Sequence, residues 1–462
     1  MTGSERFDAI VIGAGQGGVP LARAFADAGR RTLLIEAKHV GGTCINEGCT
    51  PTKTMVASAR VAYLARRGAD YGVDTGPIAI DMTRVRQRKR AIVDSFRGGG
   101  EQRIRDTANL TYLPATACFT APRTLEARLA DGTRRSLTAD CIVINTGARP
   151  AMPAIEGSDR VAWLDSTSIM ELDVVPEHLV VVGGGYIGLE FGQMMRRFGS
   201  RVTVTQRADV LLAHEDDDIC GAVAEIMRQD GLTLLFGTQV TRLQPAPNSR
   251  ILATLSSGGA PLEASHVLFA AGRVPNSDDL GCAAAGIALG RGGVITVNER
   301  LETSADGVFA IGDVNGGPAF THISYDDFRI LRTNLLQGGQ ATTRDRLVPY
   351  TLFIDPQLGR IGLTERQARA RGAVVDVYVL PMSWVARALE LDESRGLMKA
   401  IVDRGTGQIL GAAVLGIEGG EVMAVLQMAM LGQVTIDRLR DAVFAHPTLA
   451  EAFNNLFSAT PR

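Results

Sequence analysis

Short apolar runs that end at a glycine recur along this chain, and they predict buried strands followed by helices. The first run is Asp8 to Ile12; a helix-like segment follows it and leads to a second apolar run, Thr32 to Ile35. The same order returns with Leu179 to Val182 and Arg201 to Thr205. Apolar runs of this length joined by a helix are typical of parallel strands that are covered on both faces. The pattern therefore predicts an α/β fold with two strand–helix–strand units.

Both units carry the pattern Gly-x-Gly-x-x-Gly between the first strand and the helix. The glycines are Gly13, Gly15 and Gly18 in the first unit and Gly183, Gly185 and Gly188 in the second. Glycine permits the tight turn and lets backbone N–H groups at the helix start approach a pyrophosphate, whose negative charge the helix dipole favours. The sequence therefore predicts two Rossmann-like dinucleotide sites.

The two units differ in the residue that ends their second strand. The first unit ends at Glu36, whose carboxylate can accept hydrogen bonds from ribose hydroxyls. The second ends in Gln206 and Arg207, where no carboxylate repels a 2′-phosphate and a guanidinium can pair with it. We therefore expect NADPH in preference to NADH at the second site, although Arg207 as an ordinary surface charge is the alternative.

A third strand pattern suggests that the first nucleotide is a flavin. The apolar run Val308 to Ile311 ends at Gly312 and Asp313, and an acid there can hydrogen-bond a flavin's ribityl chain or only cap a turn. Further cofactor-binding candidates follow similar strands at apparent domain crossovers: Thr146, Gly147 and Gly272. Two different dinucleotide sites in one chain predict that electrons pass between a nicotinamide cofactor and FAD.

Composition excludes several other classes of protein. The chain has 462 residues, enough for about three domains. Its 52 glycines, about 11% against a usual 7% or so, lack the regular period of a fibre. The net charge of -2, from 48 Lys and Arg against 50 Asp and Glu, gives no overall basic field for nucleic acid.

No targeting or membrane segment is expected from the sequence. The first residues lack the charged, apolar and cleavage regions of a signal peptide. The most apolar late stretch, Ile409 to Leu431, is interrupted by Glu418 and Glu421, so it is unsuited to span a membrane. We interpret the basic run Arg84 to Arg90 as one solvated helix face. The expectation is a cytoplasmic protein with neither nucleic acid nor membrane as a partner.

Among six cysteines, only Cys44 and Cys49 lie close together. On a regular helix five residues rise about 7.5 Å, beyond the roughly 7 Å Cα separation that a disulfide spans. Closure therefore needs an irregular backbone, which Gly48 permits, with a helix that begins at Thr50 as N-cap and Pro51. Cys49 would then lie just outside a helix start, where a thiolate is stabilised. The histidines show no ligand spacing, so no stable metal site is predicted.

The segment Gly41 to Lys53, GGTCINEGCTPTK, resembles the active-site signature of the class I pyridine nucleotide-disulfide oxidoreductases, the family of glutathione reductase, lipoamide dehydrogenase and mercuric reductase. The motifs follow family order over essentially the whole chain. The resemblance implies two Rossmann-like domains and a C-terminal α+β dimerisation domain. Their limits would be 1–150 with 276–340 for FAD, 151–275 for NAD(P)H, and 341–462 for the interface of a homodimer.

The resemblance also implies roles for matched positions. Cys44 would attack the substrate, Cys49 would form the charge-transfer thiolate against the flavin, and Lys53 would lie by the flavin and pair with Glu190. Tyr186 resembles the tyrosine that covers the nicotinamide pocket. The alternatives are ordinary helix-surface charges for Lys53 and Glu190 and a core aromatic for Tyr186. Two further cofactor-binding candidates lie in the same signature: Gly42 and Thr43.

Near the end of the chain, His446, Pro447 and Glu451 resemble the family's HPTxxE element. In that family the element crosses the dimer interface, so His446 of the partner subunit would serve Cys44 while Glu451 orients the imidazole. A histidine, with an ordinary pKa near about 6.5, can take the proton of Cys44 and return it to a leaving thiolate. The resemblance therefore implies that only the dimer is active.

The electron acceptor is less well defined by the sequence. The final residues, 457–462, lack the cysteine pair of mercuric reductases, so efficient mercury reduction is not expected. The stretch 388–416 looks closest to the reactive-chlorine-resistance (RclA-like) flavoproteins, which are associated with copper(II) reduction. We predict an enzyme that passes electrons from NADPH through FAD and the Cys44–Cys49 disulfide to a disulfide substrate. The alternatives are a copper(II) or mercury(II) reductase and, less favoured, a non-catalytic redox-sensing flavoprotein.

Overall fold

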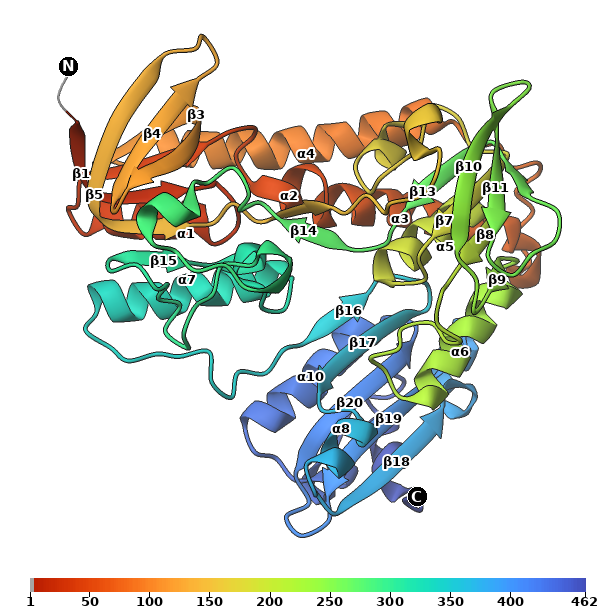
Figure 1. Cartoon of the computed structure of the whole chain (residues 1–462). Coiled ribbons are helices and arrows are strands. Elements are labelled where there is room, and N and C mark those ends of the chain that lie inside the picture. The colour runs from red at the N-terminus through yellow and green to blue at the C-terminus, as the bar shows by residue number, and fades with distance from the viewer. Residues whose placement is uncertain (1–3) are drawn as a thin grey trace. The chain divides into compact units, whose positions relative to one another are not determined.

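The computed structural model describes residues 4–462, which divide into two compact units (Figure 1). Unit 1 holds the chain up to Thr54 together with Arg84–Ala151 and Gly272–Arg346. Unit 2 holds Met55–Thr83, Met152–Ala271 and Leu347–Arg462. Each unit is therefore assembled from segments that are distant in sequence.

Unit 1 is built on a six-stranded sheet in the order β1-β2-β3-β4-β5-β15, in which β1 also pairs with β5. Its strands are β1 (Glu5–Ile12), β2 (Thr32–Glu36), β3 (Leu110–Ala121), β4 (Thr124–Leu129), β5 (Arg134–Ile144) and β15 (Val308–Ala310). The strands β2, β1, β5 and β15 pair in parallel, as their apolar runs predict. The distal half of β3 instead turns antiparallel with β4, which returns to β5. A short antiparallel pair, β6 (Ala148–Pro150) with β14 (Arg273–Pro275), joins the crossover segments.

The helices α1 (Gly18–Asp27), α4 (Met82–Arg105) and α7 (Thr321–Leu336) share a core cluster with the parallel strands of this sheet. Unit 1 also holds α2 (Gly42–Asn46) and the start of α3 (Cys49–Arg66). The apolar face of α1 packs on β1 and β2, and α1 also contacts α7. The helix starts of α1, α3 and α7 carry the residues on which the candidate site depends.

The helix α4 contains three consecutive glycines, Gly98 to Gly100, in its second half. A Cβ added at Gly98 or Gly99 would meet nothing within 4 Å, whereas one at Gly100 would lie 3.2 Å from Cγ1 of Val40. Glycine in a helix interior costs about 0.5–1 kcal/mol relative to alanine. Only Gly100 thus has a packing reason to lack a side chain.

We expect the double substitution Gly98→Ala/Gly99→Ala to stabilise the protein by about 1–2 kcal/mol, because both helical positions gain propensity without a clash. The thermal midpoint followed by circular dichroism checks this. Gly100→Ala is the matched control and should give a smaller gain, since its Cβ crowds Val40. A lower midpoint for the double variant would contradict the prediction.

Unit 2 begins with a second nucleotide-type sheet, parallel in the order β13-β7-β8-β9. Its strands are β7 (His178–Val182), β8 (Arg201–Thr205), β9 (Thr233–Leu235) and β13 (His266–Phe269), and its helices are α5 (Tyr186–Phe198) and α6 (Asp217–Gln229). An antiparallel sheet of β10 (Val240–Ala246), β11 (Arg250–Leu255) and β12 (Leu262–Ala264) follows. The apolar residues of the two sheets share one core cluster.

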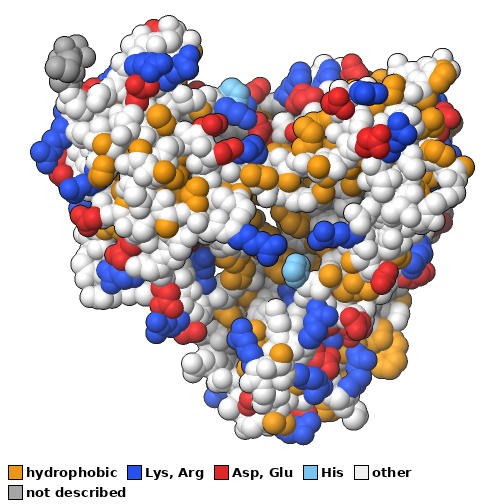
Figure 2. Space-filling model, viewed as in Figure 1, with side chains coloured by type: hydrophobic (Ala, Val, Ile, Leu, Met, Phe, Trp, Pro, Cys, Tyr) orange, Lys and Arg blue, Asp and Glu red, His pale blue; other side chains and the backbone are white. Residues whose placement is uncertain are grey.

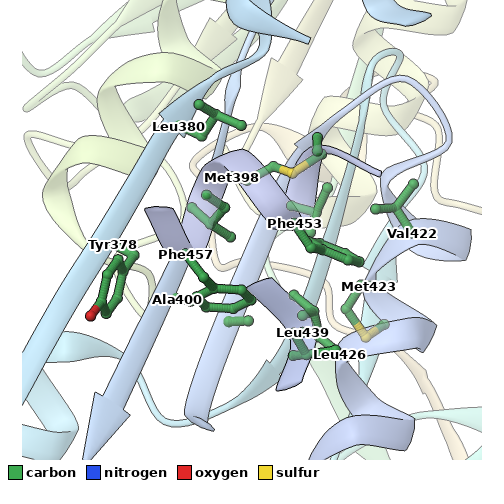
Figure 3. Close-up of a cluster of buried hydrophobic side chains, with 14 of the residues drawn as sticks. Tyr378, Leu380, Met398, Ala400, Val422, Met423, Leu426, Leu439, Phe453 and Phe457 are labelled. Carbon is green, nitrogen blue, oxygen red and sulfur yellow. The ribbon is translucent and has the colours of Figure 1, made fainter. Parts of the chain in front are cut away.

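The C-terminal part of unit 2 is an antiparallel sheet in the order β16-β17-β20-β19-β18 with helices around it. The strands are β16 (Tyr350–Leu352), β17 (Gln357–Gly362), β18 (Val375–Pro381), β19 (Leu397–Asp403) and β20 (Ile409–Gly416). The helices are α8 (Glu365–Ala370), α9 (Ala386–Glu390), α10 (Gly419–Leu431), α11 (Ile436–Arg440) and α12 (Ala452–Ser458). Side chains of the sheet and of α10, α11 and α12 interlock in a buried cluster that includes Phe453 and Phe457 (Figure 3).

The predicted fold class, two Rossmann-like units and a C-terminal α+β domain, is confirmed. Among the described residues, no helix is long and apolar enough to cross a membrane; the apolar stretch after Ile409 is split between β20 and α10. On the face in Figure 2, side chains of both charge signs are interspersed. The four domain limits stay predictions.

One local prediction needs correction. We expected a helix with Thr50 as its N-cap and Cys49 outside it, but α3 already begins at Cys49. The amide N–H of Thr52 bonds to the carbonyl of Gly48, so the helix begins two residues earlier than predicted. The basic run from Arg84 lies on α4 as predicted, although Lys89 within it is buried.

Candidate redox and nucleotide sites

At two positions of the first glycine loop, Gly13 and Gly18, neighbouring backbone atoms lie too close for any side chain. Gly13 has a φ of 106°, and a Cβ there would lie 2.3 Å from the carbonyl oxygen of Asn145. A Cβ at Gly18 would lie 2.1 Å from the carbonyl oxygen of Gly13, so the start of α1 packs directly on the loop. The close approach that the motif predicted is therefore present.

The loop also presents unused hydrogen-bond donors. Within residues 4–462, the amide N–H groups of Gly15, Gln16 and Gly17 have no hydrogen-bond acceptor. They lie immediately before α1, where the helix dipole favours negative charge. These donors fit the pyrophosphate of a dinucleotide such as FAD.

The side chain of Asn145, at the end of β5, joins this loop to two other segments. Its Oδ1 accepts the N–H of Gly18 at 2.8 Å, and its Nδ2 donates to the carbonyl of Ile311 at 3.0 Å and contacts the hydroxyl of Ser324. Nδ2 would also lie 3.0 Å from a Cβ on Gly312. Sequence reasoning missed Asn145; the available signal was a polar residue at the end of a buried strand.

We expect Asn145→Ala to weaken FAD binding by roughly tenfold or more and to destabilise unit 1 by about 1–3 kcal/mol. The reason is that it leaves the buried N–H of Gly18 and carbonyl of Ile311 without partners. Flavin fluorescence during titration of the apoprotein measures the dissociation constant.

Asn276→Ala is the matched control for this variant. Its amide donates to the carbonyl of Thr146 but does not contact the glycine loop. If both variants bind FAD as tightly as the wild-type protein, Asn145 does not hold the loop.

Glu36 ends β2 and is held by backbone N–H groups. Its two carboxylate oxygens accept the N–H of Ala14 at 2.7 Å and the N–H of Lys38 at 2.8 Å. Each oxygen retains a lone pair for a further donor. This arrangement fixes the carboxylate beside the glycine loop, which suits a ribose hydroxyl.

Asp313 follows β15 in a short 3-10 turn, Gly312–Asn315. Burial raises the pKa of its carboxyl, and the guanidinium of Arg273, 3.9 Å away, opposes that shift. The turn is braced from α7 by the buried Asp327, which accepts the N–H of Gly312 at 2.9 Å and pairs with Arg346. The carboxylate oxygens of Asp313, placed by this turn, can accept hydrogen bonds from a hydroxyl-rich chain.

The remaining cofactor candidates of unit 1 lie at the crossover. The hydroxyl of Thr146 donates to the carbonyl of Asn276 at 2.8 Å, and the N–H of Asn276 donates to Gly147. Gly147 and Gly272 have φ values of 68° and 125°, which favour glycine. These residues position the crossing strands, and their contact with a cofactor stays a prediction.

The redox segment packs against the first glycine loop. The N–H of Gly41 donates to the carbonyl of Ala14 at 2.8 Å, and a Cβ on Gly42 would lie 2.9 Å from Cα of Gly15. Gly41 and Gly42 have positive φ values of 101° and 59°. Thr43 follows on α2, where its carbonyl accepts the N–H of Glu47.

The two cysteines lie on separate helices, with the break that their spacing required. Cys44 lies in α2 and Cys49 opens α3, while Glu47 and Gly48 are non-helical between them. Both are unbonded thiols, and that of Cys44 hydrogen-bonds to Cys49. Sequence reasoning thus predicted the irregular backbone correctly.

The environment of the pair is asymmetric. The hydrogen bond to Cys49, together with burial, holds the pKa of Cys44 well above its ordinary value. The Sγ of Cys49 lies 3.2 Å from the hydroxyl of Thr321, the first residue of α7. The starts of α3 and α7 therefore both favour negative charge on Cys49.

The second glycine loop, in unit 2, shows the same close backbone contacts as the first. Gly183 has a φ of 112°, and a Cβ there would lie 2.5 Å from the carbonyl oxygen of Ala270; a Cβ on Gly188 would lie 2.0 Å from that of Gly183. The side chain of Gln206 accepts the N–H of Gly184 at 3.2 Å, as Glu36 accepts that of Ala14. Gln206 is therefore the neutral counterpart of Glu36.

Other predicted residues of the nicotinamide site surround this loop. Gly185 immediately precedes α5, and Tyr186, the first residue of that helix, is 43% exposed. Arg207 is exposed and, among residues 4–462, forms no hydrogen bond or ion pair. Glu190 is buried and accepts the N–H of Phe353 at 2.8 Å. Lys53 lies in unit 1 and Glu190 in unit 2, so their pairing stays a prediction.

His446 and Glu451 form the hydrogen bond that the family resemblance implies. The Nδ1 of His446 lies 2.8 Å from the Glu451 carboxylate, which also accepts the N–H of Thr448. The hydrogen bond and charge of Glu451 raise the pKa of the exposed imidazole. Within residues 4–462, no group of three or more His, Cys, Asp or Glu side chains can hold a metal ion.

Two glycine loops, a redox-type cysteine pair and a separate antiparallel domain define a flavin- and nicotinamide-dependent oxidoreductase, and the comparisons agree. Residues 7–327 match the pyridine nucleotide-disulphide oxidoreductase family, and residues 348–457 match its dimerisation domain. The chain belongs to this family. It is therefore an enzyme that uses FAD and NAD(P)H.

Two of its relatives are of particular interest, and a solved structure of one of them is also similar to this chain. The probable pyridine nucleotide-disulfide oxidoreductase RclA of Escherichia coli (strain K12) is 38% identical over 98% of this chain and 99% of its own. A mercuric reductase of Streptomyces lividans is 33% identical, over 96% and 94%. The copper(II) complex of the HOCl-induced flavoprotein disulfide reductase RclA from Escherichia coli superposes with a TM-score of 0.90 at 37% identity, over 98% and 99% of the two chains.

Proposed function

We propose that this enzyme reduces a small-molecule disulfide with electrons from NADPH, through the Cys44–Cys49 pair. The observation that carries the proposal is the direct packing of the redox segment on the first glycine loop, Gly41 on Ala14 and Gly42 on Gly15. That packing brings a pair of hydrogen-bonded thiols to a nucleotide loop with unused N–H donors.

The residues divide the work as follows. FAD, held by the N–H donors of the first glycine loop, would supply a hydride acceptor between NADPH and the cysteines. Cys49, favoured as a thiolate by two helix starts and by Thr321, faces the electron donor. Cys44, whose pKa is raised, carries the proton and attacks the substrate once a base removes it. One NADPH and one proton then convert one disulfide to two thiols.

We assign the base to His446 of the partner subunit, in a homodimer formed by the C-terminal domain. Unit 2 exposes large apolar side chains that a second copy can cover: Trp384, Leu389, Met428, Leu431 and Val443. Val443, three residues before His446, is fully exposed.

The proposed location of the enzyme is the cytoplasm. The cysteines outside the pair are free thiols in the described chain, which suits a reducing compartment.

The proposal is tested by anaerobic oxidation of NADPH with a panel of acceptors: glutathione disulfide, lipoamide, other low-molecular-weight disulfides, copper(II) and mercury(II). We expect turnover with a disulfide that is lost in Cys44→Ser and kept in Cys118→Ser, a change at a cysteine outside the pair. Turnover with no acceptor would contradict the proposal and favour a redox-sensing flavoprotein.

Copper(II) is the second candidate acceptor. It is favoured by the copper(II) complex of the RclA relative and by the two soft sulfur donors of the pair. One NADPH would reduce two copper(II) ions to copper(I). Turnover with copper(II) but with no disulfide, again lost in Cys44→Ser, would replace the disulfide assignment.

We propose NADPH as the preferred donor because Gln206 removes the carboxylate that would repel a 2′-phosphate, and Arg207 offers a free guanidinium. Arg207→Ala should raise KM for NADPH about tenfold with little change for NADH. Arg201→Ala, at an exposed arginine that opens β8, is the control. If the ratio of KM for NADPH to KM for NADH is the same in Arg207→Ala as in the wild-type enzyme, Arg207 does not determine the coenzyme preference.

Glu451→Gln should move the acidic limb of the pH profile for acceptor reduction to lower pH. Glu451 raises the pKa of His446, so its neutral replacement lets the imidazole act as a base at lower pH. His446→Ala should reduce the rate by about 10²–10⁴-fold. A pH profile identical in Glu451→Gln would show that His446 is not the titrating base.

A further inference from the structure

A cavity of about 650 Å³ in unit 2 is lined by an unusual concentration of arginines. Three helices, α3, α5 and α6, end at it, and the segment 392–395 before β19 borders it. The arginines are Arg66, Arg67, Arg196, Arg197 and Arg395. None of these residues has a part in the redox reaction proposed above.

Three of the five guanidiniums are neutralised by neighbouring carboxylates. The ion pairs join Arg67 to Asp392, Arg197 to Asp230 and Asp355, and Arg395 to Asp230 and Glu393. The ring of Tyr63 lies under Arg197, with 3.9 Å from the guanidinium carbon to the ring centroid. The positive charges of these three arginines are therefore balanced by carboxylates within the cavity wall.

The other two guanidiniums have only backbone partners. Arg66 donates to the carbonyl of Arg197, and Arg196 donates to the carbonyls of Asp230 at 3.1 Å and Ser200 at 3.4 Å. Among residues 4–462, neither forms an ion pair with a carboxylate. Because a guanidinium has five N–H donors, most of their donors remain for another acceptor.

The carbonyl ends of three helices lie at the cavity, and their partial negative charge favours arginines there. The carbonyl end of a helix carries roughly half a negative charge. The ends of α3, α5 and α6 therefore offset part of the two unpaired positive charges, but they do not supply acceptors for the unused donors. A ligand with several strong acceptor oxygens and a compact charge fits this site.

We propose that the cavity binds a small phosphorylated molecule, with its phosphate group on Arg66 and Arg196. A phosphate monoester carries about −1.5 to −2 charges at neutral pH and three acceptor oxygens, and arginine forks match it in geometry. The volume lies in the range of small-molecule pockets, about 300–1,000 Å³, so it leaves room for the rest of an ester.

The test is isothermal titration calorimetry of the purified FAD-loaded enzyme with glycerol 3-phosphate, and separately with inorganic phosphate, at low ionic strength and without nicotinamide nucleotide. We expect saturable binding of glycerol 3-phosphate, one per chain, that is weakened at least tenfold in Arg66→Gln/Arg196→Gln. Arg228→Gln, at an exposed arginine outside the cavity, should bind as the wild-type enzyme does.

A second pair of variants keeps both arginines. Ser394 lines the cavity, so Ser394→Asp adds a competing carboxylate and should abolish binding, whereas the neutral Ser394→Asn should retain it. No saturable binding of glycerol 3-phosphate, or binding indifferent to Ser394→Asp, would overturn the proposal. Binding of inorganic phosphate alone would also overturn it, since the cavity would then accept the free ion and not an ester. Because calorimetry measures binding and not turnover, its result does not depend on which electron acceptor the enzyme uses.

Discussion

The buried amide of Asn145 is the contact on which the first nucleotide site depends. It holds the N–H of Gly18 and the carbonyl of Ile311, and its backbone and side chain fill the space that Cβ atoms on Gly13, Gly15 or Gly312 would need. One side chain at the end of β5 thus fixes the glycine loop and the turn before Asp313. Its low exposure, 7%, makes each of these bonds costly to lose.

The segment that carries the two cysteines packs directly on this glycine loop. The redox segment packs on Ala14 and Gly15, and the two helices that start at Cys49 and Thr321 favour charge on one sulfur. The hydrogen bond to Cys49, together with burial, raises the pKa of Cys44. The pKa of the exposed His446 imidazole is also raised, by its hydrogen bond to Glu451 and by the charge of that carboxylate.

Local patterns predicted most of the fold and of the site. The buried strands, both glycine loops and the non-helical break at Gly48 depend on residues close in sequence, and the structure contains them all. The His446–Glu451 hydrogen bond, which the family resemblance implies, is also present. The start of α3 was misplaced because Thr50 and Pro51 are strong capping signals, yet the turn closes from Gly48.

What the sequence could not predict arises from residues that meet only in the fold. Asn145 contacts Gly18 across 127 positions, and Thr321 reaches Cys49 across 272. No spacing rule covers such distances. The same holds for the arginine cavity, whose residues come from three helices and a loop that are separated in the chain.

The central claim is that the electrons of NADPH pass through Cys44 and Cys49. Counting thiols in denatured enzyme before and after anaerobic reduction by NADPH tests this most directly. With six cysteines in the chain, the account predicts two more thiols after reduction of the oxidised wild-type enzyme and no gain in Cys44→Ser. Reduction of the flavin without any new thiols in the wild-type enzyme would contradict it.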